Sequence, residues 1–283
     1  MVDGQITWGG LTLGRPSVYR WRQLDGWEDL PGLDSSDEAR PSRHGAWAGR
    51  PLAESRTVTL EGSIRAPAAE VGAAVRALRS ATAVADDADL QPLTIAALGE
   101  TLTAYARCTQ RTISLTRDAR LGHIRYTLQW VCPDPTRYGA ERSLTIPAPS
   151  QTVDGLDYPV SYPLDYGAPI TGGAGTAINN GSTSARPVIT ITGPASTPLI
   201  ANQITGLTLE FALDLVEGDS LTIDTDAGTV RLNGSADRLY TLTARSAPVE
   251  AFTLPPGASS IRYRPESTST PSAAALTWRD AHL

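Results

Sequence analysis

The sequence contains no lysine, and all 24 of its basic residues are arginine. Such a bias points to a G+C-rich genome more than to any particular chemistry. It also weakens one candidate site, because the glycine-rich segment GGAG at residues 172–175 resembles a phosphate-binding loop that lacks the following lysine and the strand-to-helix context. We expect this segment to be part of a flexible connector.

Cysteine and histidine are scarce. Neither Cys108 nor Cys132 has the close-spaced partner of a zinc site or redox pair, so both are expected to be small buried residues, although their runs could form a hairpin that brings them close. His44, His123 and His282 are scattered, and no Gly-x-Ser-x-Gly motif accompanies them. The sequence therefore predicts no metal, no cofactor and no enzymatic activity.

Long apolar runs are also missing. No stretch reaches the roughly 18 apolar residues of a membrane span, and the first residues do not combine a basic patch with an apolar core. The composition predicts a soluble chain made in a cytoplasm, with no membrane partner.

Negative charge is concentrated in the second half of the chain. Residues 1–148 hold 17 arginines and 17 acidic residues, whereas residues 149–283 hold 7 arginines and 13 acidic residues. An acidic half repels phosphate backbones, so no specific nucleic-acid partner is expected, although DNA could pass through a neutral ring.

Strand-like segments dominate the first half of the 283 residues, a length sufficient for two cores. In RTVTLEGSIR, residues 56–65, Val58, Leu60 and Ile64 alternate with polar residues, which predicts a strand with one buried face. Residues 67–84 differ, since they are rich in alanine and begin with proline; we predict a helix there, packed on the sheet.

Two polar stretches interrupt these elements. Residues 25–50 have no periodicity but contain Trp27 and Trp47, which predicts a loop whose tryptophans are covered either by the domain itself or by a neighbouring subunit. Residues 149–186 concentrate proline, glycine and tyrosine and predict an extended connector laid over another surface. The candidate inter-subunit contacts are Trp27, Trp47, Tyr158, Tyr162 and Tyr166.

Residues 187–283 read as short strands separated by turns, a pattern typical of an antiparallel sandwich. Asp219, Asp224 and Asp226 could suggest a metal site or carboxylate pair, but no spaced calcium loop is present, so turn and strand-end roles are expected. The predicted organisation is mainly β: an N-terminal β-sandwich-like domain (1–148) with one helix, a connector (149–186) and a C-terminal sandwich (187–283).

Three ordered stretches of the sequence resemble distal tail proteins of long-tailed, non-contractile phages. They are GRPLAESRTVTLEGSI (residues 49–64), IRYTLQWVCPDPTRY (residues 124–138), and a third that combines NGSTSARPVITITG (residues 180–193), DSLTIDTDAGTVRLNG (residues 219–234) and LPPG (residues 254–257) followed by IRY (residues 261–263). The resemblance implies a ring-forming first domain and a galectin-like sandwich as the second.

The resemblance also implies a role and partners. Such a ring, typically of six copies, lies at the distal end of the tail in the virion, after assembly in the host cytoplasm. It joins the tail tube protein to the hub or tail-associated protein, with the tape measure protein, a tail fibre or a receptor-binding protein as further contacts.

Two other functions compete with this one. A carbohydrate-binding attachment module is suggested by the sandwich, with Phe211, Tyr240, Phe252, Tyr263 and Trp278 as candidate aromatics, although most sit in strand-like runs typical of a core. A wall-degrading enzyme would need two carboxylates across a cleft, and no motif indicates them.

Overall fold

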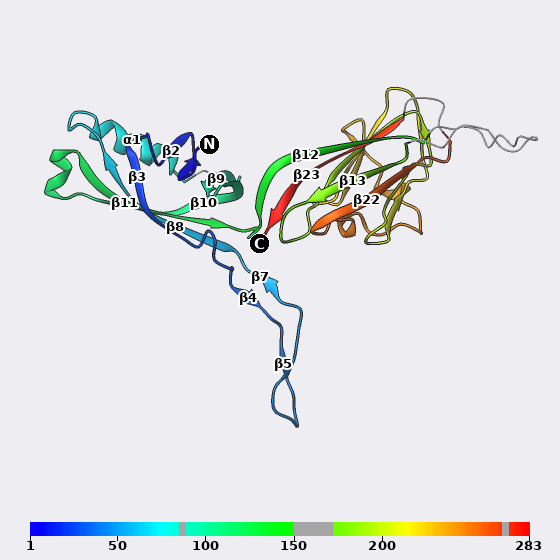
Figure 1. The fold of residues 1–283 in the computed structure, drawn as a ribbon, viewed down its shortest axis with the longest axis horizontal. Coiled ribbons are helices and arrows are strands. Elements are labelled where there is room, and N and C mark those ends of the chain that lie inside the picture. The colour runs from blue at the N-terminus through cyan, green and yellow to red at the C-terminus, as the bar shows by residue number, and fades with distance from the viewer. Residues whose placement is uncertain (85–88, 150–171, 268–271) are drawn as a thin grey trace, which may run out of the picture. The chain divides into compact units, whose positions relative to one another are not determined.

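The computed structural model describes residues 1–84, 89–149, 172–267 and 272–283 (Figure 1). The chain is mainly β, as predicted, and divides into two compact units. Unit 1 comprises Met1–Gly139 with His282–Leu283, and unit 2 comprises Ala140–Ala281. Tyr158, Tyr162 and Tyr166 lie outside the described residues.

Unit 1 contains two antiparallel sheets that share one long strand, β10 (Glu100–Ser114). The first half of β10 pairs with β9 and the second half with β11. The first sheet has the order β2 (Leu11–Leu13), β1 (Gln5–Trp8), β9 (Gln91–Ala97), β10; the second has the order β10, β11 (His123–Cys132), β8 (Arg56–Arg65), β3 (Tyr19–Asp25).

Alternating side chains build the core of unit 1. In β11 every second residue is buried, and β8 shows the same alternation with Gly62 half-buried. Leu60 pairs with Leu128 on the buried face. Trp8 of the first sheet meets Trp130 of the second, with 5.7 Å between the ring centroids. Burial of such large side chains dominates the hydrophobic stabilisation of a small domain.

The helix α1 (Val71–Ala81) lies within the predicted range of residues 67–84 and buries Val71, Val75 and Leu78. Two hydrogen bonds fasten it to the sheets: the Tyr19 hydroxyl donates to the Ala74 carbonyl, and the indole N–H of Trp8 donates to the Ala81 carbonyl. Within the described residues, no helix has the length and apolar character needed to cross a membrane.

Residues 33–53 form a two-stranded ribbon in unit 1, which we call the arm (Figure 1). At its base β4 (Leu33–Asp34) pairs with β7 (Leu52–Ala53), and further out β5 (Glu38–Ala39) pairs with β6 (Ala46–Trp47). A short 3-10 helix, η1 (Arg117–Leu121), lies between β10 and β11.

Unit 2 is an antiparallel β-sandwich, entered through β12 (Arg137–Pro147). One sheet continues from β12 in the order β23 (Ala273–His282), β14 (Val188–Thr192), β19 (Ser220–Asp224), β20 (Thr229–Leu232), β21 (Ala236–Asp237); the other is β13 (Ala174–Asn179), β22 (Gly257–Arg264), β16 (Leu199–Asn202), β17 (Leu207–Glu210). Smaller elements are the pair β15 (Ala195–Ser196) and β18 (Asp214–Leu215), η2 (Leu239–Thr241) and η3 (Val249–Ala251).

One strand lies where the sequence predicted a connector. Residues 174–179, within the expected connector 149–186, form β13 and pair with β22 from Ala174–Arg262 to Asn179–Gly257. Ala177 and Asn179 are buried there, and the Asn179 side chain donates to the Thr183 and Leu254 carbonyls. The small residues suggested little burial, but the neighbouring strand supplies the backbone partners and covers alternate side chains.

Candidate assembly surfaces

A buried arginine fixes the base of the arm. The Arg56 residue is 1% exposed, and one nitrogen of its guanidinium donates to the carbonyls of Gly26, Trp27 and Asp29 at 2.7–2.9 Å. Its Nε donates to the Pro135 carbonyl at 2.9 Å. A single side chain thereby ties the segment that leads into the arm to the segment that enters β12.

A second arginine packs over the same segment. Arg137 lies 5.6 Å from the centroid of the Trp27 ring and donates to the Glu28 carboxylate at 2.8 Å. The side chain of Arg137 is 8% exposed, whereas that of Glu28 is 54% exposed. This ion pair therefore has one partner in the interior and one in solvent.

The two arginines also affect each other. Burial lowers the pKa of the Arg56 guanidinium, and the positive charge of Arg137 lowers it further. The nearby thiol of Cys132 is neutral at physiological pH, because burial raises its pKa to about 11. Two cations therefore lie close together, and their partners among the described residues are carbonyl oxygens and the Glu28 carboxylate.

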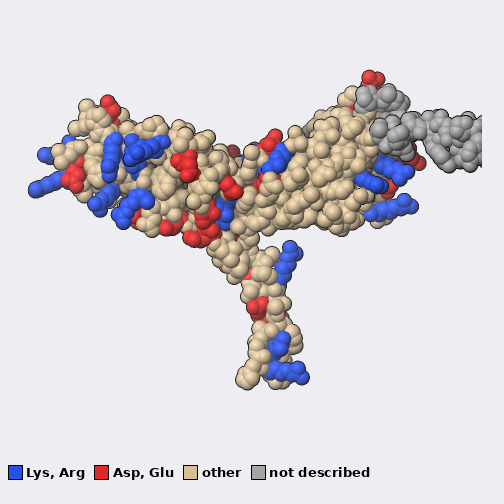
Figure 2. All heavy atoms as spheres, in the orientation of Figure 1, with Lys and Arg blue, Asp and Glu red and all other residues tan. Residues whose placement is uncertain are grey.

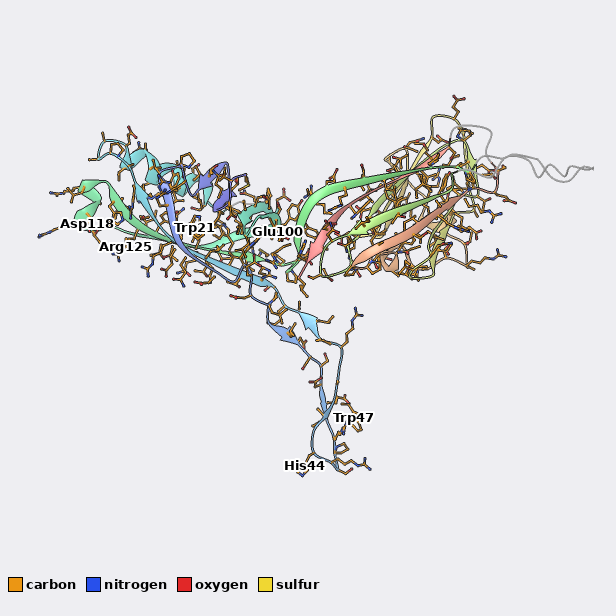
Figure 3. All side chains as sticks on the ribbon, in the orientation of Figure 1. Trp21, His44, Trp47, Glu100, Asp118 and Arg125 are labelled. Atoms are coloured by element: carbon orange, nitrogen blue, oxygen red, sulfur yellow. The ribbon has the colours of Figure 1, made fainter. Side chains whose placement is uncertain are left out.

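The arm itself is exposed along its length. Trp47 is 55% exposed, and Leu33 and Leu52 at the base are 48% and 55% exposed. Figure 3 shows His44 at the turn of the ribbon and Trp47 on its returning strand. A two-stranded ribbon without a core is marginally stable in water, so the arm has the character of a segment that another surface covers.

The second sheet of unit 1 ends in two edges with unpaired peptide groups. Within the described residues, β3 pairs only with β8, and the second half of β10 pairs only with β11. The Arg65 N–H donates to the Val18 carbonyl, so the peptide groups of Arg65 point toward β3. Because successive residues of a strand point their peptide groups to opposite sides, those of Ile64 point toward β11. Applying the same alternation to the paired residues of the neighbouring strands shows which peptide groups point outward. They are those of Arg111 and Ile113 at the β10 edge and those of Trp21 and Leu24 at the β3 edge.

The face of the second sheet that points away from the core is polar. One row across the strands reads Arg20, Ser63, Arg125, Ser114, and the next reads Gln23, Glu61, Thr127, Thr112. In Figure 2, basic side chains gather over the end of unit 1 that carries the β10–β11 connection. In an isolated unit this face is a broad polar surface in contact with solvent.

Four of the five candidate aromatic residues lie in the core of unit 2. Phe211, Phe252 and Tyr263 are 0% exposed and Trp278 is 5% exposed, whereas Tyr240 in η2 is 77% exposed. A sugar-binding surface would need exposed rings, so of the five candidates only Tyr240 is placed for that role.

The candidate aspartates of unit 2 have local structural partners, and Asp226 pairs with Arg186. Asp224 accepts hydrogen bonds from the Asp226 and Ala227 N–H groups and closes the turn between β19 and β20. Asp219 accepts from the Asn233 side chain and the Val216 N–H, and these bonds lower its pKa. Among the described residues, no group of three or more histidine, cysteine or acidic side chains could hold a metal ion.

The two predicted contact residues that the structure describes differ in their surroundings. Trp27 is 2% exposed beneath Arg137, so the cover that the sequence left open comes from its own domain, and its ring is not available to a neighbour. Trp47 lies on the exposed arm. Arg56 was not predicted to have a role. It lies on the same face as Val58, Leu60 and Ile64, and an arginine at a buried position of such an alternation is a signal that would have identified it.

Residues 180–282 match the family model described as "Siphovirus-type tail component, C-terminal domain". The second part of the chain is therefore similar to a tail component of the siphovirus type. No curated protein matches the chain.

The resemblance to distal tail proteins is confirmed. The solved structure of the SPP1 Dit (gp 19.1) protein, described as a hub of the adsorption apparatus in phages that infect Gram-positive bacteria, aligns over 99% of both chains with a TM-score of 0.65 at 13% identity. A chain of the phage P2 baseplate in its activated conformation with Ca aligns over 98% of both chains, with a TM-score of 0.50 and 11% identity. At these identities the likeness establishes the fold.

Proposed function

We propose that this chain is a structural distal tail protein that assembles, as six copies, into a closed ring at the tail tip of a long-tailed, non-contractile phage. The observation that carries the proposal is the second sheet of unit 1, which is open at both ends. The family match of residues 180–282 and the fold shared with SPP1 Dit support the assignment of the chain to a phage tail.

The direction of the strands suits a head-to-tail ring. The order β10, β11, β8, β3 is antiparallel throughout, so β3 and β10 run in opposite directions. A copy placed beside the first can therefore set its β3 antiparallel to β10 of its neighbour, and the same step can be repeated until the sheet closes. A contact between two different patches generates a ring when the rotation closes.

Closure also assigns the two faces of the sheet. The first sheet and α1 cover the apolar face, and they need space that only the outside of a ring offers. The polar face with Arg20 and Arg125 then turns toward the axis. Because serine and threonine separate these arginines, the inner wall would be hydrophilic rather than a continuous band of one charge.

The proposed ring joins the tail tube protein on one side to the hub or tail-associated protein on the other. Receptor-binding parts, a tail fibre and the tape measure protein are further possible contacts, and the role is structural rather than enzymatic. The attachment-module alternative has little support, since only Tyr240 among its aromatics is exposed.

The test is the mass and shape of the purified protein, alone and with tail tube protein. Light scattering should give a closed oligomer, and negative-stain images should show a ring with a central opening. A chain that remains monomeric in both conditions and is absent from isolated tails would contradict the proposal.

A further inference from the structure

The two strands of the arm carry opposite charge. The outgoing strand holds Asp34, Asp37 and Glu38, and the turn and returning strand hold Arg43, His44 and Arg50, with Arg40 just before the turn. All of these residues are exposed. The outgoing edge of the arm, with three carboxylates and Arg40, is therefore net acidic, and the turn and returning edge are net basic.

These charges do not neutralise each other inside the arm. The register sets Glu38 opposite Trp47 and Asp34 opposite Leu52, so acidic residues face apolar ones. In the part of the chain that the structure describes, none of the arm's carboxylates or guanidiniums forms an ion pair. Oppositely charged pairs stabilise neighbouring strands. In the arm the charged side chains have no such partner on the paired strand, so they can pair with those of a second ribbon.

Acidic and basic residues also lie at the same position along the length of the arm. The Gly49 N–H donates to the Asp37 carboxylate at 2.7 Å, and a side chain at Gly49 would meet the Ser35 and Ser36 carbonyls, so the strands are tightly apposed there. Arg50 follows directly and lies between this level and the Asp34–Leu52 pair. A basic residue on one edge is therefore level with acidic residues on the other.

We propose that the arms of neighbouring copies lie side by side, with the basic edge of each arm against the acidic edge of the next. This inference rests on the proposed ring, in which every copy has one neighbour on each side at the same height. The occupant of the arm surface is then a second copy of this chain, and Arg50 meets Asp34 of the next arm. Trp47 on the returning strand becomes covered in the same contact.

Cross-linking of paired single-cysteine variants tests this polarity. Ser35→Cys marks the outgoing strand and Ala48→Cys marks the returning strand, both in a Cys108→Ser background, since Cys132 is buried. A short bis-maleimide should link two chains when the variants are co-assembled and not when either is assembled alone. Each chain carries one reactive thiol, so a link within one arm is excluded.

Charge-reversal variants provide a second test of the contact. Arg50→Glu on the Ala48→Cys chain should lower the yield of cross-linked dimer by about fivefold, which corresponds to ~1 kcal/mol. Adding Asp34→Arg on the Ser35→Cys chain should restore the yield. Light scattering on every sample reports ring formation separately.

The outcomes distinguish the two proposals. A ring whose cross-link requires both variants and follows the charges supports the contact between arms. A ring without that cross-link, or one in which single variants link equally well, overturns the contact and leaves the ring standing. Monomers in all samples overturn both.

Discussion

The edge strands of the sheets are covered in unit 2 at places where they are open in unit 1. In unit 2 the outer side of β17 is occupied by a loop, because the Thr243 and Ala247 N–H groups donate to the Glu210 and Thr208 carbonyls, and β21 is only two residues long. In unit 1 the second sheet ends on β3 and on the second half of β10, which pair with no outer strand among the described residues. At the start of β3 the Tyr19 carbonyl accepts from the Gly14 N–H, and the remaining six residues continue as an open edge.

Short or covered edges are how soluble proteins avoid unwanted strand pairing. Unit 2 follows that rule at β17 and β21, whereas unit 1 departs from it at two places that are related by strand direction. This difference supports the proposal that the second sheet of unit 1 receives a strand from a neighbouring copy.

The largest effect is expected from Ile113→Pro. Proline removes the N–H that points to the free edge of β10, so the neighbour loses a ladder hydrogen bond while the pairing of β10 with β11 keeps its own. Light scattering should show loss of the oligomer at concentrations where the unmodified protein is fully assembled.

Ile113→Ala is the matched control, because it removes the same side chain and keeps the N–H. It should assemble normally. If both variants assemble, or both fail, the edge of β10 is not the contact and the head-to-tail arrangement is wrong.

Arg56→Ala should cause the largest loss of stability at the base of the arm. Four carbonyl oxygens lose their donor, and each buried unsatisfied group costs ~1–3 kcal/mol, partly recovered by water. We expect the free energy of unfolding of unit 1 to fall by about 3–5 kcal/mol in urea denaturation followed by tryptophan fluorescence.

The exposed Arg65 at the end of β8 provides the comparison, and Arg65→Ala should change stability by less than about 0.5 kcal/mol. A similar small loss for Arg56→Ala would mean that the arm base is held by the Trp27 packing alone.

Glu28→Gln should have a smaller effect. Half-exposed ion pairs contribute ~0–1 kcal/mol, and the amide oxygen of glutamine still accepts from Arg137. The measured difference in unfolding free energy should shrink further in high salt, since screening weakens the charge interaction. A loss above about 2 kcal/mol would show that Glu28 compensates both buried arginines and not only Arg137.

The smallest effect concerns unit 2. Hydrogen bonds lower the pKa of Asp219 in the folded state, so its contribution to stability is present above the unfolded pKa and is lost as pH falls through the folded one. Asn233→Ala should raise the pKa of Asp219, which carboxyl NMR titration measures directly. An unchanged titration would assign the shift to the Val216 N–H alone.

Much of the fold could be predicted from local pattern. The alternation in residues 56–65 and the alanine-rich helical spacing after Pro67 are local signals, and both elements formed where they were expected. The strand at residues 174–179 was missed because glycine, alanine and threonine carry almost no hydrophobic signal. Its pairing is decided by β22, which lies more than 70 residues away in the sequence.

The assembly surfaces could not be predicted from the sequence for a similar reason. Trp47 and Trp27 look alike in a polar stretch, and only the position of Arg137, more than 100 residues further on, shows that Trp27 is enclosed. The open edges of β3 and β10 depend on strand order, which no local pattern reports.

The arrangement of β3 and β10 has a consequence for growth control. A sheet with two complementary ends adds copies indefinitely unless the angle between successive copies brings the last end back to the first. Curvature would then separate a finite particle from a filament. Changes that flatten the sheet, such as removal of the extra residue in the bulge between Trp21 and Gln23, should produce long polymers with intact β3–β10 contacts, visible by electron microscopy.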